Sequence, residues 1–127
     1  MNDRSLRLVG LRGATTCVEN SIQAIEESVR VLIDALVERN GLTPDRIVSL
    51  TFSVTSDLDA CFPAAIARRR SGWDGVALLD CQQMAVRGDL ERCIRVLAHA
   101  WLQSDQEASH PYLEGASQLR PDRSGHN

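Results

Sequence analysis

The stretch between Ile22 and Val37 constrains the fold of this chain more than any other feature of the sequence. Its apolar side chains recur at steps of three and four residues, at Ile22, Ile25, Val29, Leu32, Ile33, Leu36 and Val37. Such spacing predicts one apolar helix face. The charged residues fall on the other side: Glu26, Glu27, Arg30, Asp34 and Glu38. Asn20 or Ser21 can cap this helix and Gly41 ends it. An apolar helix face must be buried, so we expect a sheet beneath it.

Three other segments, residues 7–16, 46–55 and 75–81, have the character of β-strands. The second, "RIVSLTFSVT", alternates its side chains in the way that suits a half-buried strand. Between the last two lies "FPAAIARRRSGW", which predicts a short helix with Pro63 in its first turn and Gly72 past its end. This order of elements predicts the α+β class, with helices layered on one face of a sheet.

Residues 92–102, "RCIRVLAHAWL", are ambiguous. Their alanines favour a helix, but Ile94, Val96, Ala98 and Ala100 alternate with larger or polar residues as they would in a strand. Residues 110–127 hold one short strand at best, and we expect the polar end, about residues 123–127, to be a flexible tail.

Length and composition are those of one globular domain spanning residues 1–127. The chain is 43% hydrophobic and 24% charged, with a net charge of −3, which argues against nucleic acid as a partner. No apolar stretch approaches the roughly 18 residues that span a bilayer, and the first residues lack the apolar core of a signal peptide. We expect no membrane partner and a cytoplasmic protein.

The basic side chains of this sequence are all of one type. All 14 basic residues are arginine, which excludes Schiff-base lysines and the phosphate-binding P-loop. The four cysteines form no C-x-x-C pair, and neither a metal-ligand spacing, a G-x-G-x-x-G motif nor a Ser-His-Asp pattern occurs. We therefore expect no metal and no cofactor. What remains is Arg12, Arg68, Arg95 and Arg120, of which Arg95 is unusual because it interrupts an apolar alternation.

Five segments carry a resemblance to a known family. "GLRGATT", "DLDACFPAAIAR", "SGW", "RCIRVL" and "YLEGASQLRPD" occur in this order, between about Leu8 and Asp122. In these segments the chain resembles the AroH-type, or Bacillus-type, monofunctional chorismate mutases. The resemblance implies a homotrimer with a ferredoxin-like mixed sheet in each subunit, a pseudo-barrel formed by the three sheets, and active sites between subunits. It also implies that residues 92–102 form a strand.

The reaction that the resemblance implies is the isomerisation of chorismate to prephenate, a step of the shikimate pathway toward phenylalanine and tyrosine. This Claisen rearrangement needs no proton transfer, no covalent intermediate and no cofactor. The enzyme must hold a flexible dicarboxylate in a compact chair and stabilise the charge that develops on the ether oxygen. Arginine side chains suit both tasks.

The resemblance also implies roles for particular residues. Arg95 would donate to the ether oxygen, and Arg12 and Tyr112 would bind the enolpyruvyl carboxylate. Arg68 and Arg120 would attract the second carboxylate. The remaining predicted substrate-binding residues form the walls: Phe62, Ala64 and Ala65 from the adjacent subunit, then Leu78, Leu79, Cys81, Gln82 and Leu119.

Two positions depart from the family pattern in a way that bears on catalysis. Gln83 stands where members commonly carry a glutamate that accepts from the ring hydroxyl and pairs with the arginine at Arg95. Asp80 stands where a cysteine or another small residue is usual. Our hypothesis is that the carboxylate has moved, so that Asp80 accepts from the hydroxyl and orients Arg95 while Gln83 makes a weaker contact. Alternatively, Asp80 only ends a strand. Ala65, at a position where some members have lysine, should matter less.

Two other functions stay open on these residues. One is a non-catalytic trimeric module that binds a carboxylate metabolite, with Gln83 marking lost activity. The other is a small trimeric enzyme that acts on enamine or related acids. Incubation with chorismate separates the three possibilities: conversion indicates the mutase, binding without conversion indicates the module, and absence of binding rejects what the resemblance implies.

Overall fold

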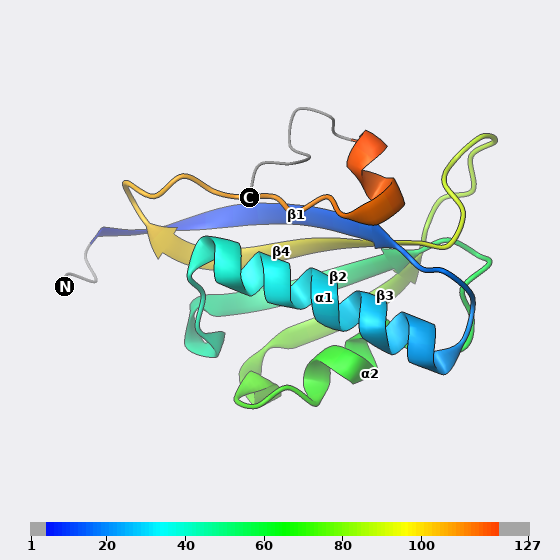
Figure 1. Ribbon diagram of the computed structural model, residues 1–127. Helices are drawn as coiled ribbons and strands as arrows, with labels where there is room; N and C mark the ends of the chain where they lie inside the picture. Colours follow the sequence, from blue (N-terminus) through cyan, green and yellow to red (C-terminus); the bar gives the residue numbers. More distant parts are fainter. Residues whose placement is uncertain (1–4, 120–127) are drawn as a thin grey trace.

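The computed structural model describes residues 5–119, which form one sheet with two helices packed against it (Figure 1). The elements follow the predicted order: β1 (Leu6–Thr16), α1 (Ile22–Asn40), β2 (Ile47–Val54), α2 (Pro63–Arg68), β3 (Ala77–Gln82) and β4 (Cys93–Gln103). Three short 3-10 helices, Pro44–Arg46, Trp73–Gly75 and Glu114–Leu119, complete it. Arg120 and the predicted tail, residues 123–127, lie outside the described residues. No helix in the described range is long and apolar enough to span a membrane.

The four strands are ordered β1-β4-β2-β3 across the sheet. β4 runs antiparallel to both β1 and β2, whereas β2 and β3 are parallel. Figure 1 shows α1 and α2 on the same side of this sheet. The predicted α+β class with a mixed sheet and helices on one face is therefore confirmed.

The ambiguous residues 92–102 form strand β4, despite their alanines. β4 pairs along its length with β1 and also with β2, so hydrogen bonding to two neighbours outweighs the helix propensity of alanine. Ala98 and Ala100 are fully buried. The choice between helix and strand was thus made by tertiary pairing.

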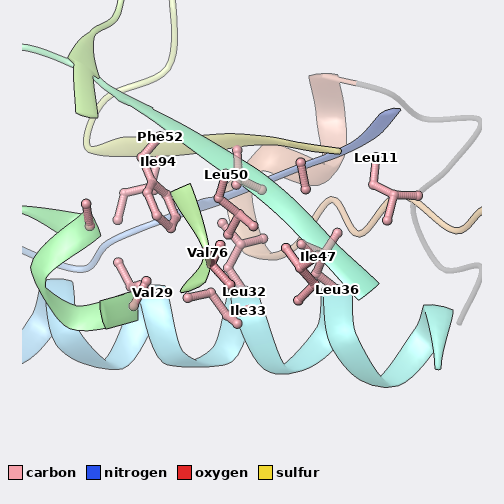
Figure 2. Close-up of a cluster of buried hydrophobic side chains, with 14 of the residues drawn as sticks. Leu11, Val29, Leu32, Ile33, Leu36, Ile47, Leu50, Phe52, Val76 and Ile94 are labelled. Carbon is pink, nitrogen blue, oxygen red and sulfur yellow. The ribbon is translucent and has the colours of Figure 1, made fainter. Parts of the chain in front are cut away.

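The core lies between α1 and the sheet (Figure 2). Val29, Leu32 and Leu36 of α1 are fully buried, as are Leu50 and Phe52 of β2. Each such side chain contributes roughly 1.5–3 kcal/mol by leaving water. The N-terminal end of the predicted apolar face departs from the pattern, because Ile22 is exposed.

The ends of α1 follow the expected chemistry. Ser21 is the capping residue, and its hydroxyl accepts a hydrogen bond from the backbone N–H of Ala24 at 3.1 Å. Gly41 ends the helix at φ 60°, the left-handed conformation that glycine adopts without strain.

The other face of the sheet carries no α-helix among the described residues, and only the 3-10 helix Glu114–Leu119 packs on one end of it, where Ala116 clusters with Ala14 of β1. Along β4, Ile94 and Val96 point into the core, so the intervening Arg95 and Leu97 lie on this uncovered face. After β4 the chain runs back along the outer edge of β1, where Ala14 forms an isolated bridge with Tyr112 (Figure 1). The uncovered face and this returning segment together position the candidate site.

Candidate active site

A cavity of about 510 Å³ opens over the uncovered face of the sheet. Five of the residues predicted to contact substrate line it: Arg12, Gln83, Arg95, Tyr112 and Leu119. They come from β1, β4, the end of β3 and the C-terminal segment. Its size and mixed polar and apolar lining suit a small organic ligand, and its two arginines suit an anionic one.

Tyr112 reaches this cavity because the C-terminal segment is tied to β1. The N–H of Ala14 donates to the carbonyl of Pro111 at 3.0 Å, and the N–H of Leu113 donates to the carbonyl of Ala14 at 2.8 Å. The neighbouring Gly13 leaves room for this approach, since a Cβ there would lie 2.8 Å from the Pro111 carbonyl oxygen. The glycine of "RGATT" thus has a structural reason in the position of Tyr112.

Arg95 lies near the start of β4, opposite Ala14 of β1 and Ser53 of β2. Its Nη2 donates to Oδ1 of Asp89 at 3.0 Å. Its Nε is buried and has no hydrogen-bond partner among residues 5–119. A buried N–H without an acceptor is unfavourable, so a ligand oxygen that reached it would relieve a cost already present in the folded protein.

Gln83 lies in the same cavity as Arg95. Its Oε1 accepts from the Ser53 hydroxyl at 2.5 Å, and its backbone N–H donates to the carbonyl of Val54 at 2.6 Å. The amide is therefore oriented by β2 and makes no contact with Arg95 that would replace a carboxylate.

Five of the other predicted residues lie at a second cavity of about 650 Å³ beside α2 and β3. Phe62, Ala65, Asp80, Cys81 and Gln82 line it. Phe62 is 71% exposed, which is unusual for a large apolar side chain. Ala64 is buried at the start of α2, Arg68 is exposed at its end, Leu78 packs against the core and Leu79 is exposed. Within the described chain these residues thus lie outside the cavity that contains Arg95.

Asp80 does not contact Arg95 within the described chain, so its predicted role in orienting Arg95 would require a neighbouring subunit and stays a prediction. Asp80 pairs with Phe52, which points into the core, whereas Arg95 pairs with Ser53, the next residue along β2. Because side chains alternate along a strand, the two lie on opposite faces of the sheet. The carboxylate of Asp80 instead accepts from the backbone N–H of Ala64 at 3.0 Å.

Asp80 acts as a substitute cap for α2, whose own capping position is Phe62 and has no side-chain acceptor. Burial raises the pKa of the Asp80 carboxyl, while the Ala64 hydrogen bond and the charge of Arg68 act in the opposite direction. A carboxyl whose pKa is raised in the folded state holds its proton more tightly in the folded protein than in the unfolded chain. Its ionisation therefore costs stability above the folded pKa, and this cost disappears as the pH falls through that pKa.

Asp80→Asn should be slightly more stable than the parent chain at pH 7, by less than about 1 kcal/mol because the group is partly solvated. The asparagine oxygen still accepts from Ala64, but no charge is buried. The advantage should shrink as the pH is lowered toward 4, which urea unfolding at the two pH values measures. Asp74→Asn, the same change on an exposed acid, is the control. If the parent chain were more stable than Asp80→Asn at pH 7, the cost assigned to the charge of Asp80 would be contradicted.

Two residues that hydrogen-bond to predicted site residues were not predicted from the sequence: Ser53, which lines the cavity with Arg95, and Asp89, which lies in the loop before β4. Asp89 follows a glycine in "RGDLERC" and looks like an ordinary turn residue, and Ser53 looks like one of several polar residues in an alternating strand. Neither has a sequence signal of its own. Both were identified only by their contacts with Arg95 and Gln83.

Comparison with known proteins decides the family. Residues 8–123 match the sequence family described as chorismate mutase type I. The chain belongs to this family. Chorismate mutase AroH from Bacillus subtilis (strain 168) is 38% identical over 116 residues, which cover 91% of each chain. Chorismate mutase AroH from Thermus thermophilus is 39% identical over 115 residues, which cover 89% of this chain and 93% of the relative.

A solved structure agrees with the family assignment. A chorismate mutase from Clostridium thermocellum superposes with a TM-score of 0.80 at 41% identity, covering 87% of this chain and 99% of the other. The family predicted from the five segments is confirmed, and so is the assignment of this chain to the chorismate mutases, which are isomerases.

Proposed function

We propose that this chorismate mutase, acting as a single domain in the cytoplasm, converts chorismate to prephenate for phenylalanine and tyrosine biosynthesis. The observation that carries the proposal is Arg95, a cation whose buried Nε has no hydrogen-bond partner in the described part of the chain and which lies beside a cavity that also contains Arg12 and Tyr112. A fixed positive group next to a polar cavity suits a reaction in which negative charge develops on one oxygen.

Binding and catalysis would be divided among these residues. Arg12 and Tyr112 hold the enolpyruvyl carboxylate, and Arg95 donates to the ether oxygen as its bond to carbon breaks. Leu119 limits the space in which the substrate can extend. Holding the two reacting carbons together removes much of the entropic barrier, and the charge of Arg95 lowers the remainder. No residue has to gain or lose a proton.

A homotrimer with sites between subunits would complete this cavity. The uncovered face exposes Leu79, Leu97 and Trp101, whose exposed fractions are 60%, 42% and 40%. An apolar surface of this kind is more often an interface than a surface in contact with water. In such a trimer Phe62, with Ala64, Ala65 and Arg68 around it, would approach the arginine cavity of a neighbouring subunit. Leu78, Cys81 and Gln82 would complete that wall, and Arg120 would attract the second carboxylate.

Loss of the ultraviolet absorbance of chorismate, with prephenate as the product, tests the proposal. We expect turnover with purified protein alone, with no added metal or cofactor, and a trimeric mass by light scattering. Binding of chorismate without conversion would instead support the carboxylate-binding module. Absence of both binding and conversion would contradict the proposed function, while a monomeric mass together with turnover would contradict only the shared site.

A further inference from the structure

Arg95 has a carboxylate partner in its own chain, and it is Asp89 in the loop between β3 and β4. The ion pair joins Arg95 Nη2 and Asp89 Oδ1 at 3.0 Å, and the two side chains are only 31% and 20% exposed. Screening by water is therefore weaker than for a surface pair. We propose that Asp89 is the positioning residue for Arg95: it fixes the orientation of the guanidinium without touching substrate. This inference rests on the proposed function.

Asp89 is itself held in place by hydrogen bonds of both its side chain and its backbone. Its Oδ1 also accepts from the backbone N–H of Leu90 at 2.8 Å, and its own N–H donates to the carbonyl of Val86 at 3.1 Å. Leu90 packs against the small cluster that contains Tyr112. The carboxylate is thus tied to the loop backbone, and the loop is tied to the segment that carries a carboxylate-binding residue.

The end of the loop is anchored as well. The backbone N–H of Arg92 donates to both oxygens of Asp57, at 3.1 and 2.9 Å, and Arg92 Nε donates to the carbonyl of Cys17 at 3.0 Å. A side chain can orient another only if its own backbone is restrained. The five residues between Asp89 and Arg95 meet this condition, because the turn is fixed before β4 begins.

The contact also leaves Arg95 able to act on a ligand. Asp89 engages only Nη2, and Nε keeps its N–H without an acceptor among the described residues. An arginine fork is planar and rigid, so fixing one nitrogen limits the positions of the others. Of the polar groups described in this cavity, Gln83 is neutral and already accepts from Ser53. Asp89 is therefore the anionic contact that sets the direction of Arg95.

Positioning predicts a particular kinetic signature. Asp89→Ala removes the anchor, so kcat should fall about tenfold or more, since a small misplacement of a catalytic group is costly. The KM should stay the same or fall, because an anion near a site for a dicarboxylate opposes binding. Asp89→Asn keeps the acceptor oxygen and should recover most of kcat. Glu91→Gln, which removes a charge from an exposed side chain in the same loop, is the matched control.

A second measurement does not depend on turnover. In ¹⁵N NMR of the arginine side chains, the Nε–H of Arg95 should be rigid in the parent chain and in Asp89→Asn but mobile in Asp89→Ala. If Asp89→Ala does not fold, Asp89→Glu takes its place, because an added methylene shifts the carboxylate and should also lower kcat.

Three results would overturn the proposal: a kcat for Asp89→Ala within twofold of the parent or above it, a loss expressed only in KM, or an equally rigid Arg95 without Asp89. A parent chain that does not convert chorismate would count against the proposed function instead, and the NMR comparison would still decide whether Asp89 orients Arg95.

Discussion

Arg95→Ala should lower kcat for the conversion of chorismate by about a thousandfold. A single fixed donor aimed at a developing oxyanion is worth about 10²- to 10³-fold, and a charged donor in a half-buried place lies at the upper end of this range. Arg95→Lys should recover little, because an ammonium is a point charge that cannot be bound by Asp89 at one nitrogen while another faces substrate. Steady-state kinetics followed by chorismate absorbance measures both variants.

Loss of Arg95 also leaves the partly buried carboxylate of Asp89 without its cationic partner, and this cost in stability must be separated from the effect on catalysis. The double variant Arg95→Ala, Asp89→Ala removes both charges, so it should regain stability but not activity. Arg30→Ala is the control for loss of one arginine, because Arg30 lies on the exposed side of α1 and pairs only with Glu27 and Asp34 in the described structure. A kcat for Arg95→Ala within tenfold of the parent would contradict the role assigned to Arg95.

Gly13→Ala should destabilise the fold by about 2–3 kcal/mol, as overpacking of a tight contact does. The new Cβ would lie 2.8 Å from the Pro111 carbonyl oxygen and 3.3 Å from a Leu32 methyl group. The carbonyl cannot move away freely, because it accepts a hydrogen bond from Ala14. Moving the segment would displace Tyr112, so KM for chorismate should rise as well. Urea unfolding and steady-state kinetics measure the two effects.

Gly10→Ala is the matched control, since it makes the same change in the same strand. A Cβ at Gly10 would meet only a Leu97 methyl group at 3.9 Å, which is ordinary contact. We expect little change in KM there, and stability should be unchanged or slightly higher, because alanine has less backbone entropy than glycine in the unfolded chain. Equal effects at the two glycines would mean that the approach of Pro111 is not what requires Gly13.

Much of the fold could be predicted from local patterns. The apolar spacing in α1, its cap at Ser21 and its end at Gly41 follow from side-chain geometry alone. The alternation in β2 predicted the strand at nearly its observed bounds, 46–55 against Ile47–Val54. The short helix was predicted too long, because α2 ends at Arg68 and the chain then turns through Gly72 at φ 83°.

The site was harder to predict than the fold. The resemblance brought together Arg12, Arg95, Tyr112 and Leu119, and one cavity contains all four. It did not indicate which carboxylate faces Arg95. Asp80 was the natural candidate by sequence position, but a strand that alternates its faces points Asp80 toward α2 and away from the arginine. The carboxylate that meets Arg95 belongs to a loop residue with no motif around it.

The sequence by itself determined the helices and most of the strands, because these follow from spacings of a few residues, and the resemblance of five segments indicated the family. Local pattern left residues 92–102 open between helix and strand; the family resemblance indicated the strand, and pairing with β1 and β2 accounts for it. The tertiary structure alone decided that Gly13 admits Pro111, and that Asp89 rather than Asp80 pairs with Arg95 within the chain. The physical reason is the same in each case. These outcomes depend on which segments far apart in the chain become neighbours, and a local pattern contains no record of a partner that lies in another strand or at the end of a loop.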